Sequence, residues 1–234
     1  KPQIADQFGL GYFKNFLDDK LETSVEAYYK KMDNTVDFKD HAVLLLNQKI
    51  EGEIRTGESE AYGLELFVKY TGKKISGWAS YTFSHTERTI KGINDGKSYL
   101  APYDKPHNIS LVWNYELTKR TTISANWVYA TGQPITLPVG TFEVDGVKVP
   151  IYAERNEQRM PDYHRLDLAL TIKNKEKEGQ RWKGEWNFSI YNAYARHNPW
   201  AINLVQDEKN PKVSYFESIY LFSFFPSVTY NFTF

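Results

Sequence analysis

The sequence predicts an all-β protein, a transmembrane antiparallel up-and-down β-barrel with about nine strands. Three observations favour this fold class. Apolar and polar residues alternate with a period of two along most of the 234 residues. Aromatic residues make up 16% of the chain, and Tyr and Trp favour places where one end of the ring is dry and the other wet. Short and long connections between the alternating segments also follow one another in turn.

The first four strands are predicted on either side of short turns. Apolar side chains such as those of Val25, Ala27 and Tyr29 share one face, and small or polar side chains share the other. The first short turn falls at residues 17–20, and a longer polar stretch separates the two pairs. The four predicted strands cover residues 8–13, 21–32, 61–70 and 78–88.

The next four strands repeat this arrangement. A tight turn at residues 118–120 joins the fifth strand to the sixth, and a turn rich in Lys, Gly and Glu joins the seventh to the eighth. These strands cover residues 107–117, 121–132, 164–173 and 185–194. The long connections, which we expect outside the membrane, include residues 86–105, 131–162 and 196–218.

The closing strand carries the clearest alternation. Val228, Tyr230, Phe232 and Phe234 alternate with small polar residues, and Tyr220, Phe222 and Phe224 lie in phase with them. Chain ends are usually solvated and frayed, so a row of large aromatics at a terminus needs an apolar environment. We therefore expect the side chains of the closing strand, from Val228 to Phe234, to contact lipid.

Composition excludes several classes of protein. Lys plus Arg and Asp plus Glu both number 29, so the chain lacks the basic excess expected of a nucleic-acid-binding protein. The chain has no Cys, and its five His residues have no paired-ligand spacing, so we expect no metal site and no cofactor. Nucleophile-elbow and phosphate-binding loop motifs are absent, so we predict no enzyme. The segment opens without a leader pattern, and no apolar run is long enough for a spanning helix.

A soluble β-barrel or sandwich is the alternative fold, because its strands also alternate. The two folds differ in which face the apolar side chains occupy. In this sequence the face opposite the large apolar residues is rich in Ser, Thr, Asn and Gly, which suits a wet lumen. The aromatic strand ends and the alternating connection lengths favour the membrane barrel.

A set of motifs resembles the C-terminal barrel of TonB-dependent outer-membrane receptors, particularly those of the Bacteroidota type. The motifs occur in order over nearly the whole chain: LGYFKN, SVEAYYKKMDN, EAYGLELFVK, SYTFSHTER, YDKPHNISL, YATGQPITLP, RNEQRMPDYHRLDLAL, FSIYNAYARHNPW and FPSVTYNFTF. The resemblance implies a barrel of about 22 strands filled by a plug that binds TonB and imports scarce ligands. Candidate ligands are a siderophore complex, a cofactor, a glycan or a peptide.

An odd strand number supports the same interpretation, because bacterial single-chain barrels have even numbers of strands. We expect residues 1–234 to be a single C-terminal barrel segment, with the plug and the upstream strands absent from this chain. Its partners would be those missing parts, TonB through the plug, and the lipid and lipopolysaccharide of a Gram-negative outer membrane. The barrel-assembly machinery would read the closing strand through Phe234. A plugless passive porin or adhesion barrel is the alternative function, and a soluble β-barrel binding module is a further alternative.

Five residues near the long loop before the seventh strand are candidate lumen or ligand contacts. Arg155, Arg159 and Arg165 concentrate positive charge there, which would attract an anionic ligand, hold lipopolysaccharide phosphate or pin the loop. Arg165 and Asp167 are two residues apart on one strand face, beside His164. They suit either a lumen ion pair or a contact with a polar ligand or the plug.

Overall fold

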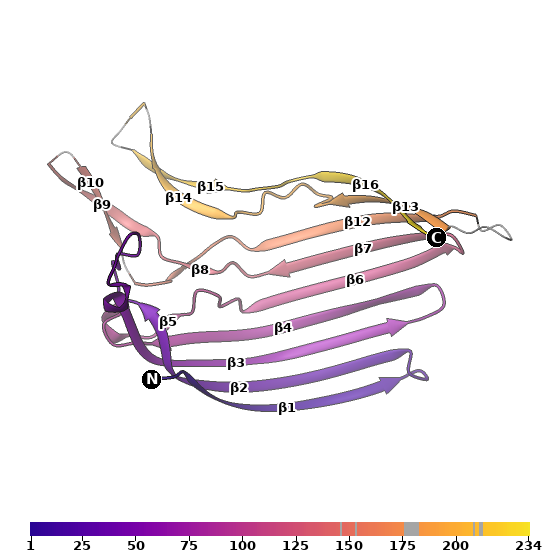
Figure 1. Cartoon of the computed structure of the whole chain (residues 1–234), viewed down its shortest axis with the longest axis horizontal. Coiled ribbons are helices and arrows are strands. Elements are labelled where there is room, and N and C mark those ends of the chain that lie inside the picture. The colour runs from indigo at the N-terminus through magenta and orange to yellow at the C-terminus, as the bar shows by residue number, and fades with distance from the viewer. Residues whose placement is uncertain (146, 153, 176–182, 208, 211–212) are drawn as a thin grey trace.

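The computed structural model describes residues 1–145, 147–152, 154–175, 183–207, 209–210 and 213–234. Its principal sheet has 10 strands, of which nine follow one another in an antiparallel path β1-β2-β3-β4-β6-β7-β12-β13-β16, with β5 paired to β4. Figure 1 shows these strands side by side, with the N-terminus and the C-terminus at opposite ends of the strands. The predicted nine-strand meander is confirmed.

The first four strands form the longest part of the sheet. They are β1 (Ile4–Phe16), β2 (Leu21–Phe38), β3 (Ile54–Thr71) and β4 (Ile75–Thr89). The turn from β1 to β2 falls where it was predicted, with left-handed backbone at Leu17, Asp18 and Asp19. β2 and β3 extend well beyond residues 21–32 and 61–70, because they keep pairing past the apolar segment, from Lys31 with Glu60 to Phe38 with Ile54.

The remaining strands of the path are β6 (His107–Thr118), β7 (Thr121–Ala130), β12 (Tyr163–Lys173), β13 (Lys183–Tyr191) and β16 (Phe225–Thr233). Most of the predicted turn between β12 and β13, residues 176–182, lies outside the described residues. The predicted alternation of long and short connections is confirmed, with the long loops at the N-terminal end of β1 (Figure 1).

Two regions expected to be loops contain further strands. β8 (Pro134–Ile135) pairs with β11 (Gln158–Arg159), and β9 (Pro138–Val144) pairs with β10 (Val147–Tyr152). β14 (Ala201–Gln206) and β15 (Ser214–Ile219) form a third hairpin in the last loop. Short elements complete the loops: β5 (Tyr99–Leu100), η1 (Ile50–Glu53) and η2 (Asn94–Gly96).

The closing strand is shorter than the run of phased aromatics suggested. β16 begins at Phe225, opposite Tyr191, the last residue of β13. Beyond that point β13 turns away through left-handed Asn192, so residues 220–224 have no strand on which to continue the ladder.

Strand registers place the apolar side chains on one face of the sheet. One row runs from Leu66 through Tyr81 and Ile109 to Tyr129, and the next from Val68 through Ala79, Leu111 and Trp127 to Leu166. Large apolar side chains on this face are exposed in the structure, with Leu10 82% and Val228 61% accessible. A row this apolar and this exposed is suited to acyl chains.

The apolar band has clear limits along each strand. On β3 it runs from Tyr62 to Tyr70, a length of nine residues that matches the 9–11 or so needed to cross a bilayer. Aromatic rings at both ends of the band are typical of membrane interfaces. Beyond it, the same face carries charges, including Lys31, Glu60 and Glu87. The loop ends of β2, β3 and β4 therefore project out of the membrane.

The opposite face, called the inner face below, is polar along the same ladders. Its rows include Ser80 with Ser110, and Asn114 with Ser124. The small buried core lies at the loop end of the sheet, where Ile90 and Ile93 in the loop after β4 and Tyr99 in β5 are almost fully buried. No helix in the described part of the chain is long and apolar enough to cross a membrane.

Candidate functional site

The loop end of β2 turns a carboxylate onto the inner face. A β-bulge between Met32 and Thr35, with Asn34 in left-handed conformation (φ 57°), interrupts the alternation of β2. Asn tolerates this conformation better than most residues. After the bulge Thr35 and Asp37 are buried while Val36 is exposed. The bulge therefore aims Asp37 toward the inner face, where the loops cover it.

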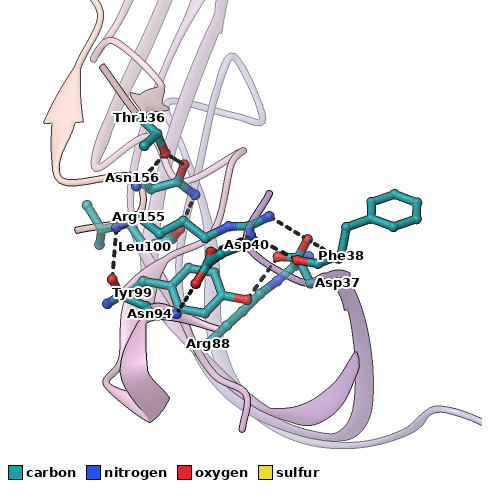
Figure 2. A network of polar contacts seen from close by, with 10 residues as sticks. All are labelled: Asp37, Phe38, Asp40, Arg88, Asn94, Tyr99, Leu100, Thr136, Arg155 and Asn156. Atoms are coloured by element: carbon teal, nitrogen blue, oxygen red, sulfur yellow. Dashed lines mark hydrogen bonds and ion pairs between the residues drawn. The ribbon is translucent and has the colours of Figure 1, made fainter. Parts of the chain in front are cut away.

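Asp37 is the centre of a polar cluster to which β2, β4, β5 and the loop between β10 and β11 contribute (Figure 2). One carboxylate oxygen, Oδ2, accepts hydrogen bonds from Arg88 Nη1 at 3.0 Å and from the Tyr99 hydroxyl at 2.9 Å. The other, Oδ1, accepts from Arg155 Nη2 at 2.9 Å. Two guanidinium groups thus share one buried carboxylate through charge-assisted hydrogen bonds, which are stronger than hydrogen bonds between neutral groups.

Arg155 ties the loop between β10 and β11 to β2. Its Nη1 donates to the carbonyl oxygen of Phe38 at 2.9 Å and to Asp40 Oδ1 at 3.2 Å, and its backbone N–H donates to Asn94 Oδ1 at 2.9 Å. The guanidinium lies 5.5 Å from the centre of the Tyr99 ring. The contacts of Arg155 join residues 56 to 118 positions apart in sequence, so the loop crosses the mouth of the sheet.

The next residue strengthens this connection. Asn156 is buried, and its side chain donates to the carbonyl oxygen of Leu100 at 2.7 Å. Its backbone N–H donates to Thr136 Oγ1 at 2.9 Å (Figure 2).

Burial, assisted by the hydrogen bond to Asp37, raises the pKa of the Tyr99 hydroxyl, so Tyr99 remains a neutral donor at physiological pH.

A second cluster forms around Asp104, which is almost completely buried. Its carboxylate accepts the backbone N–H of Thr86 at 2.6 Å and is ion-paired with Arg159. Arg159 also donates to the carbonyl oxygen of Gly132 at 3.1 Å. A Cβ at Gly132 would overlap the carbonyl oxygen of Met160, so the chain needs glycine for the two ends of the loop to meet.

Hydrogen bonds to Asp162 also hold the base of the loop between β7 and β12. Asp162 accepts hydrogen bonds from the Tyr129 hydroxyl at 2.6 Å and from the Gly132 N–H at 3.0 Å. These two donors hold the pKa of the Asp162 carboxyl below its usual value. The carboxylate therefore stays ionised over the physiological range and keeps both contacts.

Arg165 and Asp167 form a third cluster on the inner face of β12. Arg165 Nη2 lies 2.9 Å from Asp167 Oδ2, and Arg165 Nη1 donates to the hydroxyls of Tyr163 and Tyr191, both at 2.8 Å. The guanidinium is 4.1 Å from the centre of the Tyr191 ring. Asp167 Oδ1 also accepts the backbone N–H of Asn192 at 2.9 Å, where β13 ends.

His164 does not lie beside them, which corrects the expectation that it is a lumen contact. In the ladder it stands opposite Tyr129 on the apolar face, because neighbouring residues of a strand point to opposite sides. Its Nδ1 is 2.8 Å from the Tyr194 hydroxyl. The five candidate residues therefore occupy separate places: Arg155 at the Asp37 cluster, Arg159 at Asp104, Arg165 with Asp167 on β12, and His164 on the other face.

The three arginines expected to make a positive mouth are all paired with carboxylates. Arg155 pairs with Asp37 and Asp40, Arg159 with Asp104, and Arg165 with Asp167. Their guanidinium groups hold segments of the chain together, and little of their charge is left uncompensated. No group of three or more potential metal ligands occurs in the parts of the chain that the structure describes.

Sequence reasoning did not single out Asp37, Arg88, Tyr99 or Asp104, although these residues organise the loop end. Asp104 lies within the YDKPHNISL motif, which was a usable signal. The sequence around Asp37 contains no such signal, because its arginine and tyrosine partners are 51 to 118 residues away.

The closing-strand residues lie together at the other end of the sheet. Val228 stands opposite Phe188, and Tyr230 opposite Trp186, both on the apolar face. The ring centres of Tyr230 and Phe232, and of Phe232 and Phe234, are 6.3 Å apart. Phe234 is 93% exposed.

Solved structures share this fold at low sequence identity. The ferripyoverdine receptor of Pseudomonas aeruginosa is 10% identical over 99% of this chain, with a TM-score of 0.57. The siderophore receptor PiuA from Acinetobacter baumannii is 18% identical over 97%, with a TM-score of 0.61. The ferric citrate transporter FecA is 14% identical over 98%, with a TM-score of 0.59. The chain spans 27%, 28% and 31% of these proteins, respectively.

No curated protein matches the chain. A family model described as "TonB dependent receptor-like, beta-barrel" matches residues 1–193, which is most of its length. The chain therefore belongs to the TonB-dependent receptor β-barrel family, a family of outer-membrane receptors and transporters of Gram-negative bacteria and not of enzymes.

Proposed function

We propose that this chain is the C-terminal barrel part of a TonB-dependent transporter that imports a scarce ligand across the outer membrane. The observation that carries the proposal is the arrangement of the loops: they fold over the polar face of the sheet and are locked there by Asp37 and Asp104. Loops held in this way form a ligand-receiving mouth on a polar wall. Two solved structures of similar fold support a scarce ligand, since one is a ferripyoverdine receptor and the other a ferric citrate transporter.

The same proposal assigns residues 1–234 to one barrel segment that completes a cylinder of about 22 strands with strands and a plug outside this chain. Within the described residues, β1 pairs only with β2, and β16 only with β13, so each presents an open edge. Unpaired backbone groups are costly in lipid, and further strands would satisfy them. The ordered motifs favour the Bacteroidota type of receptor. Its apolar face would contact lipid and lipopolysaccharide.

Binding to TonB tests this function without knowledge of the ligand. We expect the full-length protein to bind a purified periplasmic domain of TonB and to leave planar lipid bilayers closed to ions. A plug that reaches TonB also blocks the bore, so the two results belong together. Steady ion conductance without TonB binding would instead identify the passive porin. A protein that neither binds TonB nor conducts ions would favour the adhesion barrel.

The closing strand gives a second test, of assembly. We propose that the barrel-assembly machinery reads Val228, Tyr230, Phe232 and Phe234. The three aromatic rings stack in sequence order, and Val228, Phe232 and Phe234 are exposed. Deleting Phe234 is expected to lower the heat-modifiable, folded fraction of the full-length protein in outer membranes. Replacing Thr233, the neighbour of Phe234 in sequence, with Ser is the matched control and should leave that fraction unchanged. An unaltered folded fraction after the deletion would exclude the signal.

A further inference from the structure

The inner face holds a hollow of about 620 Å³ beneath the last long loop. Strands β6, β7, β12 and β13 form its wall, and residues around Trp200 and Phe222 form its roof. The residues that matter for its chemistry are Lys105, Asn108, Tyr163, Tyr191, Trp200 and Phe222. This hollow is separate from the Asp37 cluster, because none of that cluster's residues lines it.

Aromatic rings surround the hollow on two sides. On the roof, Trp200 is 65% exposed and Phe222 is 63% exposed. On the wall, Tyr163 and Tyr191 are held by the two hydrogen bonds from Arg165, whose own position is set by Asp167. Arg165 is thus a positioning residue for two tyrosine rings. Rings held in place lose little freedom when a ligand stacks on them.

The charge of the lining is nearly neutral. Its residues include no Asp or Glu, and Lys105 is the one formally charged side chain among them in the described part of the chain. The nearby guanidinium of Arg165 is already paired with Asp167. Recognition of a multiply charged anion relies on several charge-assisted hydrogen bonds. This lining offers one cation, so it is poorly suited to such an anion.

Neutral polar groups are available instead. The side chains of Asn108, Ser110 and Gln133 line the hollow, and within the described residues none of them makes a hydrogen bond. Together they offer amide and hydroxyl donors and acceptors beside the rings. A purely apolar ligand would bury these groups without partners, at a cost in affinity.

We propose that this hollow binds an uncharged, hydroxyl-rich ring ligand, namely an oligosaccharide segment, with a sugar ring stacked on Trp200. The apolar C–H face of a sugar ring fits an indole, and its hydroxyls can both donate to and accept from Asn108 and Gln133. This inference rests on the proposed import function and names the class of ligand that the mouth receives.

Binding to full-length receptor in detergent tests the proposal. The probes are an array of neutral oligosaccharides and, in parallel, ferric citrate and ferric siderophores. We expect at least one neutral oligosaccharide to bind, and Trp200→Ala to weaken its binding at least tenfold. Trp200→Phe keeps a stacking ring and should recover most of the affinity. Trp113→Leu, on the lipid-facing side, is the matched control and should change affinity less than twofold.

Three results would overturn the proposal: binding of the iron complexes alone, binding of no probe, or an unchanged affinity in Trp200→Ala. Heat modifiability on gels verifies that each variant is folded. TonB binding separates this inference from the proposed function. If TonB binds but no oligosaccharide does, the ligand class is wrong and the importer stands; if TonB does not bind, the importer is wrong.

Discussion

Replacing Asp37 with Ala is expected to destabilise the full-length barrel by about 3–5 kcal/mol, because the change leaves buried charges without their partner. Arg88 and Arg155 both pair with this carboxylate, and their side chains are only 12% and 21% exposed. Tyr99 loses its acceptor at the same time. The free energy of unfolding in urea, measured in detergent micelles, gives the effect directly. Limited proteolysis should show earlier cleavage between residues 131 and 162.

Glu154→Ala is the matched control. It also removes a carboxylate from an ion pair at the loop end, with Lys97, but those side chains are 51% and 62% exposed. Exposed ion pairs are screened by water and contribute little to stability, so this variant should stay close to the parent protein. Equal losses for Asp37→Ala and Glu154→Ala would show that the Asp37 cluster has no special role.

Replacing Val228 with Arg is expected to cost about 2–4 kcal/mol if the residue lies near the bilayer midplane, and less toward an interface. Val228 is 61% exposed on the apolar face, one row inside the Trp186 and Tyr230 rings. A charge there would face acyl chains. Urea unfolding in phospholipid vesicles measures the cost.

Thr229→Arg is the comparison, because Thr229 stands opposite Asn187 on the inner face. A charge at this position would face water, so we expect a cost below about 1 kcal/mol, as for exposed sites elsewhere. Similar losses at both positions would mean that the two faces of the sheet have been assigned the wrong way round.

Most of the principal sheet could be predicted from the sequence, because its alternation reflects a local property. Each of the nine strands of the path pairs with the next one along the chain, even across the long loops, so the order follows once the segments are recognised. The β9–β10 hairpin was missed although the Asp145-Gly146 dipeptide between alternating residues is a strong hairpin signal. It was missed because the whole stretch was interpreted as a single loop.

The clusters at the loop end could not be predicted in the same way. The two-residue spacing of Arg165 and Asp167 places them on one strand face, so their proximity is local. Arg155 meets Asp37 only because a bulge at Asn34 re-aims β2 and a loop crosses three strands. Neither event leaves a pattern in the residues around Arg155. His164 was misplaced because its closeness in sequence to Arg165 was given more weight than strand parity.

The distance in sequence between Arg155 and Asp37 also limits when the mouth can close during biogenesis. Hairpins β1–β2 and β3–β4 can form from local contacts, whereas pairing Asp37 with Arg155 requires a chain closure of 118 residues. Until β12 joins the sheet, Asp37 has Arg88 but not its second guanidinium partner. We therefore expect the wall to form before its entrance takes shape, and a chain stalled midway would lack the contact between Asp37 and Arg155.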